Sequence, residues 1–139
     1  MKSIDFFLEM DPPTATYQEK NMNWKTKSMY QGDRSADAKA KLRAHLVKHI
    51  PDQPLNGPLR MTVTWGFLAK GKHRFNTWCM NKPDLDNAQK ALQDAMTELG
   101  FWKDDAHITD LHTSKIWTWH PGIFISVEEL PEAVEESYD

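Results

Sequence analysis

The chain has 139 residues, of which 40% are hydrophobic and 27% charged, a composition typical of one globular domain with a single core rather than of a disordered chain. Its longest apolar runs are only a few residues, so we expect neither a membrane-spanning helix nor a signal peptide. Cys79 is the only cysteine, which excludes an internal disulfide and a zinc site built on several cysteines, and favours a cytoplasmic location.

The net charge of −3 is unevenly distributed. Residues 128–139 carry six acidic residues and no basic one, so the rest of the chain carries 17 basic and 14 acidic residues. The segments 20–48 and 60–82 are basic, and aspartates gather downstream of them. Basic segments around an acidic cluster suit a polyanion held against a cation site, although solvated surface charge explains the totals equally well.

In the first half of the chain, alternating apolar residues predict a strand over residues 3–10. The proline pair at 12–13 ends it, and the polar, basic stretch up to residue 32 predicts a long loop or a loop with a short hairpin. Ser35 is expected to cap a helix over about residues 36–50. Prolines and a glycine then predict a turn.

In the second half, strict alternation in LRMTVTWGF predicts a strand over residues 59–67, followed by a basic loop. A helix is expected over about 86–99, with Gly100 as its stop, and strands over 107–117 and 123–130. This β-α-β-loop-α-β-β order predicts an α/β fold of the α+β type, a two-layer sandwich in which a mixed sheet packs against two main helices.

The stretch NKPDLDNAQKAL, at 81–92, holds two aspartates, Asp84 and Asp86, at the start of the second predicted helix. Aspartate is favoured at helix N-caps and in the first turn, so capping alone explains one of them. Pro83 favours an extended conformation for Lys82, and in extended chain residues i and i+2 point the same way. The two carboxylates therefore converge if the helix begins at or after Asp86.

Lys90 lies four residues after Asp86, so the two share a helix face. That face lies away from the apolar stripe of the helix, which includes Leu92 and Met96, so Lys90 is not forced into the core. The lysine is either half of an ion pair worth about 0.2–0.5 kcal/mol or a cation placed beside a phosphate.

Another pair, Asp104 and Asp105, follows the helix in the turn FWKDD, where aspartate is common for reasons of turn geometry. A short turn after the helix would return the chain antiparallel and would bring the next strand back alongside Asp84 and Asp86. Three or four carboxylates without a thiolate or a histidine cluster suit a hard cation, Mg²⁺ or Mn²⁺. Such an ion lowers the pKa of a bound water and neutralises charge on a phosphodiester.

Residues 82–108, KPDLDNAQKALQDAMTELGFWKDDAHI, closely resemble the RusA family of Holliday junction resolvases. The family hallmark is Asp-x-Asp-Asn at a helix start, a lysine one turn later, and a Gly-aromatic-Trp-x-Asp-Asp turn, and every element is present. The proline pair at 12–13 matches the family's N-terminal loop. That loop usually reads Pro-Pro-Ser-x-Asn, whereas this chain has PPTAT, so the roles of its polar residues do not transfer.

The resemblance implies a homodimeric, Mg²⁺-dependent endonuclease that acts on four-way DNA junctions in recombination and repair and is often encoded by phages or prophages. It implies one RusA-like nuclease domain over 1–130, followed by an acidic, disordered tail at 131–139. No organic cofactor and no membrane partner are expected. Carried over residue by residue, the metal ligands would be Asp84, Asp86 and Asp105, with Asp104 in a lesser role and Lys90 as the essential cation.

The basic loops are expected to follow DNA phosphates, and the residues we assign to this contact are Lys25, Lys27, Lys70, Lys72, Arg74 and Lys82. Trp24 or Trp78 would stack on opened bases, although packing in the core or a dimer interface is the commoner role of a tryptophan. Two other functions stay open. One is a junction-binding or regulatory module that no longer cuts, and the other is a general flap or replication-fork nuclease.

Overall fold

The computed structural model describes residues 1–14, 21–23, 28–30 and 33–134, and its centre is a mixed four-stranded sheet. The strands are β1 (Ser3–Leu8), β4 (Leu59–Leu68), β5 (Ile108–Thr118) and β6 (Gly122–Glu129), in the spatial order β1-β6-β4-β5. β4 pairs in parallel with β5 and antiparallel with β6, which pairs antiparallel with β1. The predicted mixed sheet is confirmed.

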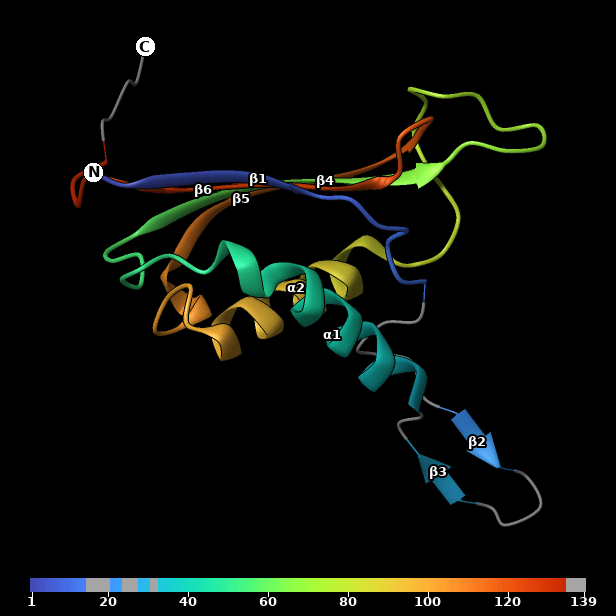
Figure 1. Ribbon diagram of the computed structural model, residues 1–139, viewed down its shortest axis with the longest axis horizontal. Coiled ribbons are helices and arrows are strands. Elements are labelled where there is room, and N and C mark those ends of the chain that lie inside the picture. Colours follow the sequence, from blue (N-terminus) through green and yellow to red (C-terminus); the bar gives the residue numbers. More distant parts are fainter. Residues whose placement is uncertain (15–20, 24–27, 31–32, 135–139) are drawn as a thin grey trace.

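Two helices, α1 (Asp33–Leu46) and α2 (Leu85–Leu99), cover one face of the sheet (Figure 1). The predicted two-layer α+β fold is therefore confirmed. The segment predicted as a loop or hairpin contains a hairpin of β2 (Asn21–Asn23) and β3 (Ser28–Tyr30), which Figure 1 shows beyond the start of α1. In the part of the chain that is described, no helix is long and apolar enough to cross a membrane.

The core lies between the inner face of the sheet and the helices. β4 is flanked on both sides, and its alternating residues from Leu59 to Phe67 are buried, as the strand prediction requires. On α2 the predicted stripe is buried at Ala88, Leu92 and Met96. Burying a large apolar side chain contributes about 1.5–3 kcal/mol, so this stripe is what holds α2 against the sheet.

The first helix differs from its prediction at both ends. α1 begins at Asp33, so Ser35 lies inside the helix and is not its N-cap. It ends at Leu46 rather than near residue 50, and the short 3-10 helix η1 (Val47–His49) follows. Ile50 adopts an extended conformation, φ −60° and ψ 126°. The cause is the next residue, Pro51, because a proline disfavours the helical conformation of the residue before it.

The segment from β4 through α2 to β5 forms a crossover unit, because two parallel neighbours are joined by a helix. α2 ends at Gly100, which has the left-handed φ of 88° that favours glycine, and the Phe101 N–H donates to the Met96 carbonyl. The short 3-10 helix η2 (Asp105–His107) then leads into β5. This turn reverses the chain, and β5 runs back alongside α2 to the segment before Asp84, where Lys115 donates to the Pro83 carbonyl, as the sequence predicted.

The predicted tail, 131–139, is described only as far as residue 134. The strand predicted over 3–10 ends two residues early, at Leu8. The strands predicted over 107–117 and 123–130 are each displaced by one residue, as Ile108–Thr118 and Gly122–Glu129. Differences of this size are ordinary at strand ends and leave every side chain on its expected face.

Candidate active site

The start of α2 positions the two aspartates differently. Asp84 is the N-cap residue, with an extended backbone at φ −65° and ψ 135°, but its side chain makes no capping hydrogen bond. Its Oδ1 lies 3.5 Å from Nζ of Lys82 instead, and both side chains are exposed. The capping explanation therefore does not account for Asp84.

The convergence argument needed the helix to begin at or after Asp86, and this condition is not met. The helix begins at Leu85, so Asp86 belongs to its first turn, while Asp84 is still extended. The two backbones differ, and the i, i+2 rule for extended chain does not relate their side chains. Of the two, it is Asp86 that lines a cavity against β5.

The turn before α2 is held by β5. The ammonium group of Lys115, on β5, donates to the carbonyls of Asn81, at 2.7 Å, and Pro83, at 2.6 Å. Pro83 is buried and follows a cis peptide bond with Lys82. These contacts fix where the first turn of α2 begins relative to the sheet, and therefore where Asp86 lies.

Asp86, Lys90 and Asp105 line one cavity of about 440 Å³ between α2, η2 and β5. Asp86 and Lys90 are exposed and lie one turn apart on the same helix, as the sequence predicted. Asp105 is half-buried and reaches the cavity from η2, after the chain has reversed. Leu111 and Thr113 of β5 complete the opposite wall. Three residues predicted from separate parts of the sequence are thus brought together by the fold.

Asp104 and Asp105 differ although they are adjacent. The Oδ1 of Asp104 accepts a hydrogen bond of 2.9 Å from the Ala106 N–H, which makes Asp104 the N-cap of η2. Asp104 is exposed and is not among the residues that line the cavity, whereas Asp105 is. The explanation of this pair as turn residues therefore applies to Asp104, whereas Asp105 stays a candidate residue of the site.

Gln89 is a polar residue of the cavity that the sequence reasoning missed. Its side chain is only 3% exposed, and its Nε2 donates to Oε1 of Gln93 at 3.1 Å. Within the described residues, Oε1 of Gln89 has no hydrogen-bond partner. An unpartnered buried oxygen costs about 1–3 kcal/mol, so it is an unusual feature in a wall of a cavity. Two features of the sequence could have indicated Gln89: it is next to Ala88 of the apolar stripe, and it lies three residues after Asp86.

The donor set of the cavity fits a hard cation. Two carboxylates supply oxygen ligands of the kind that Mg²⁺ prefers, and the ion commonly uses only one or two protein carboxylates together with waters and substrate phosphates. Over the ranges that the structure describes, no three His, Cys, Asp or Glu side chains are gathered closely enough to hold a metal ion by themselves. Substrate oxygens or water would complete the coordination.

The residues expected to contact DNA are only partly described. Lys70, Lys72, Arg74 and Lys82 are exposed on the loop between β4 and α2. Lys25, Lys27 and Trp24 lie outside the described residues. Trp78, in the same loop, is 72% exposed, so it does not pack in the core of this chain.

Comparison with known proteins points to the family that residues 82–108 resemble. The chain matches the family model described as Endodeoxyribonuclease RusA over residues 11–128. It is 34% identical over 129 residues to the Crossover junction endodeoxyribonuclease rusA of Lactococcus phage r1t, an alignment that covers 91% of this chain and 98% of the phage protein. It is 37% identical over 94 residues to the Uncharacterized protein YqaN of Bacillus subtilis, over 60% of this chain and 66% of that one. The Crossover junction endodeoxyribonuclease RusA of Escherichia coli K12 is 54% identical over 33 residues, 24% of this chain and 28% of that one.

Proposed function

The chain belongs to the RusA family of endodeoxyribonucleases, and on that premise we propose that it hydrolyses phosphodiester bonds in Holliday junctions during recombination and repair. The observation that supports the proposal is that Asp86, Lys90 and Asp105 line the same cavity. It combines two carboxylates with an ammonium group, the chemistry that a phosphodiester and a divalent cation need together. The cavity is open to solvent through the exposed Asp86 and Lys90, so a DNA backbone can reach it.

In this mechanism Asp86 and Asp105 would hold a divalent cation, Mg²⁺ or Mn²⁺, with the Gln89 amide in the wall beside them. When bound, the ion supplies an activated water and neutralises charge on the phosphate. Lys90 places its ammonium group beside the same phosphate and stabilises the negative charge that develops there. The family resemblance makes Asp84 a further carboxylate ligand in this proposal; its side chain is exposed, is not used for capping and pairs with Lys82. Asp104 supports Asp105 by capping the short helix that carries it.

We assign the chain a homodimeric state, because a junction is roughly two-fold symmetric and resolution needs two matched cuts. The basic loop between β4 and α2 follows phosphates, which makes binding sensitive to salt. We also assign a cytoplasmic location, which agrees with a single, buried cysteine. The molecular mass in solution tests the homodimer, and the salt dependence of DNA binding tests the role of the basic loop.

The proposal is tested by cleavage of a synthetic four-way junction in Mg²⁺, beside a flap, a linear duplex and an EDTA control. Asp86→Asn and Asp105→Asn should each cut at least about 100-fold more slowly, because each removes an anionic oxygen from the cation site. Junction binding should persist, since the loss of a negative charge does not weaken affinity for DNA. Asp94→Asn is the matched control. It makes the same change on α2 outside the cavity, and its rate should stay within about two-fold of the unchanged protein.

The metal assignment has a readout that does not depend on activity. Without DNA, Mg²⁺ should raise the melting temperature of the unchanged protein and of Asp94→Asn, but not that of Asp86→Asn. Full cleavage by Asp86→Asn would contradict the site assignment. Binding of junctions without cleavage in any divalent metal would identify a non-cleaving module, and equal cutting of flap and junction would identify a general branched-DNA nuclease.

A further inference from the structure

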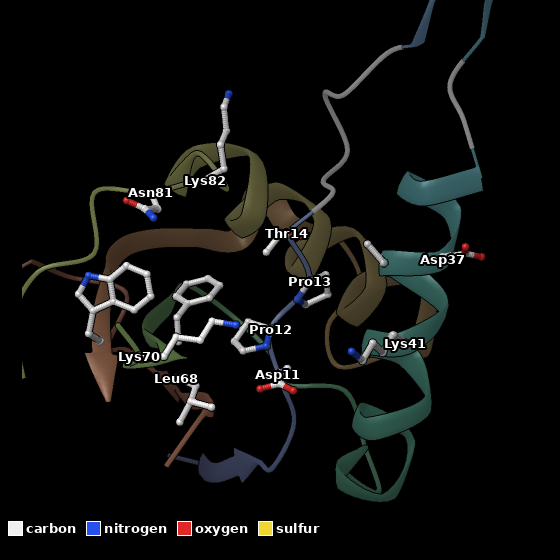
Figure 2. Close-up of a pocket in the computed structure, with 13 residues that line it drawn as sticks. Asp11, Pro12, Pro13, Thr14, Asp37, Lys41, Leu68, Lys70, Asn81 and Lys82 are labelled. Atoms are coloured by element: carbon white, nitrogen blue, oxygen red, sulfur yellow. The ribbon is translucent and has the colours of Figure 1, made fainter. Parts of the chain in front are cut away.

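A second cavity, of about 690 Å³, lies outside the candidate active site, and the two share no lining residue. Its walls come from the turn after β1, from α1, from the end of β4, from the loop that precedes α2 and from β5 (Figure 2). Its volume lies within the range of about 300–1,000 Å³ that is typical of ligand pockets. This cavity is built from distant parts of the chain, and of its lining only the basic loop has been given a role above, as a contact for DNA phosphates.

The lining of this cavity combines cations with aromatic rings. Three exposed lysines, Lys41, Lys70 and Lys82, and one exposed carboxylate, Asp11, lie at its rim, while Phe67 and Trp117 are buried in its wall. Figure 2 shows the Lys70 side chain directed into the cavity, toward Pro12, and Asp37 directed away from it. An aromatic wall with a lysine rim suits a ligand that has a flat ring and an anionic group, as a nucleotide does.

A third cavity, of about 410 Å³, continues the second along the same loop. The two share Asn81 and Trp117 as lining residues. The ring of His73 stacks on Trp117, with centroids 4.0 Å apart and planes 14° apart. Trp78 and Met80 line the third cavity, and 72% and 92% of their surfaces are exposed. We call the two cavities together the loop groove.

Trp78 and Met80 of the loop groove are exposed although the loop is well anchored. The N–H groups of Ala69, Asn76 and Cys79 donate to carbonyls of β5 at 2.8, 2.6 and 3.1 Å. Exposed apolar surface held in a fixed position usually marks a binding surface, and fixing it in advance lowers the entropy that binding costs. Residues 69–83 of the loop carry four basic residues and no acidic one, and Asp84 follows at the N-cap of α2, so the expected ligand of the loop groove is an anion with apolar faces.

We propose that the loop groove binds an unpaired strand of the DNA substrate, with a base stacked on Trp78 and phosphates beside Lys70 and Lys82. This inference rests on the proposed function, because it takes branched DNA as the substrate. Paired bases within a duplex hide their faces in the stack, whereas an unpaired base at a branch point offers them. In this proposal the loop groove distinguishes opened DNA from linear duplex. The cavity of Asp86, Lys90 and Asp105 then does not have to make that distinction itself.

The test is binding in EDTA, where no cleavage occurs, of a labelled oligothymidylate of about 12 nucleotides and of a blunt duplex, each followed by fluorescence anisotropy. Trp78→Ala should weaken oligothymidylate binding about 5- to 100-fold, the effect of losing one base stack, and should change duplex binding less than two-fold. Trp78→Phe should restore most of the affinity, because it keeps a ring. Lys70→Ala should reduce the slope of the logarithm of affinity against the logarithm of salt concentration by about one.

Two control variants define the result. Phe124→Ala removes an exposed ring from β6, and Lys48→Ala removes an exposed charge from η1, both outside the loop groove. Neither should alter oligothymidylate binding by more than about two-fold. Unchanged binding by Trp78→Ala, or an equal loss for the duplex, would overturn the proposal. Failure of the unchanged protein to cut a junction would refute the proposed function, while a selective loss in Trp78→Ala would still support the loop groove.

Discussion

The adjacent aspartates of the FWKDD turn provide a sharp test, because the structure gives them different tasks. Asp104 caps η2 through a hydrogen bond from the Ala106 N–H, and Asp105 lines the cavity proposed as the active site. Substitutions at Asp104 should therefore change stability without directly removing a catalytic group. Substitution at Asp105 should do the reverse.

The magnitudes follow from these contacts. Loss of an N-cap side chain costs about 0.5–2 kcal/mol, and η2 is a single exposed turn, so Asp104→Ala should cost about 0.5–1 kcal/mol. For a domain of this size such a loss lowers the melting temperature by roughly 2–5 °C. Asp104→Asn should melt like the unchanged protein, because asparagine caps as well as aspartate. Asp105→Asn should alter stability by less than about 0.5 kcal/mol and should slow cleavage at least about 100-fold.

Thermal unfolding followed by circular dichroism gives the first set of numbers, and cleavage of a labelled four-way junction gives the second. Asp104→Asn is the decisive variant, since it removes the charge and keeps the cap. If it lost as much cleavage as Asp105→Asn, the division of tasks would be wrong and both aspartates would act in catalysis. A larger loss of stability in Asp105→Asn than in Asp104→Ala would refute the capping argument.

Two further predictions concern the fold. A Cβ at Gly122 would overlap the Phe7 ring and the Leu8 carbonyl, so Gly122→Ala should lower the free energy of unfolding in urea by about 1–3 kcal/mol, and an unchanged midpoint would contradict it. The hydrogen bond from Lys39 lowers the pKa of Glu98 below its ordinary value. The interaction therefore stabilises the fold at a pH above that ordinary value, and this stabilisation is lost as the pH falls through the lowered pKa. Glu98→Gln should therefore cost about 0.5 kcal/mol near pH 7, and the cost should vanish in acid; a pH-independent difference would refute this origin.

Much of the fold could be predicted because its signals are local. The period-two pattern of β4 and the stripe of α2 are set by neighbours in sequence, and both elements were expected within one residue of their observed bounds. The end of α1 was misjudged because the apolar spacing continues to Ile50, whereas the backbone responds to Pro51. The strand order, with β6 between β1 and β4, depends on pairings between distant segments that no local pattern records.

The candidate site divides in the same way. Asp86 and Lys90 are one helical turn apart, so their shared face follows from spacing alone. Asp105 joins them only because the chain reverses after Gly100, which the glycine signalled. Gln89 escaped notice because its burial depends on packing against Met61, across the layer interface. The basic residues of the loop groove and its Trp78 were predicted to contact DNA, but the cavities were not, since their walls come from five separate segments.

The contacts of Lys115 have a consequence for where a strand is cut. One ammonium group donates to carbonyls on both sides of Lys82, so the end of the loop groove and the start of α2 are attached to the same point of β5. The distance between the loop groove and the Asp86 cavity is therefore set before DNA binds. If a strand binds in the loop groove as proposed, we expect this constant separation to give a constant number of nucleotides between the branch point and the cut.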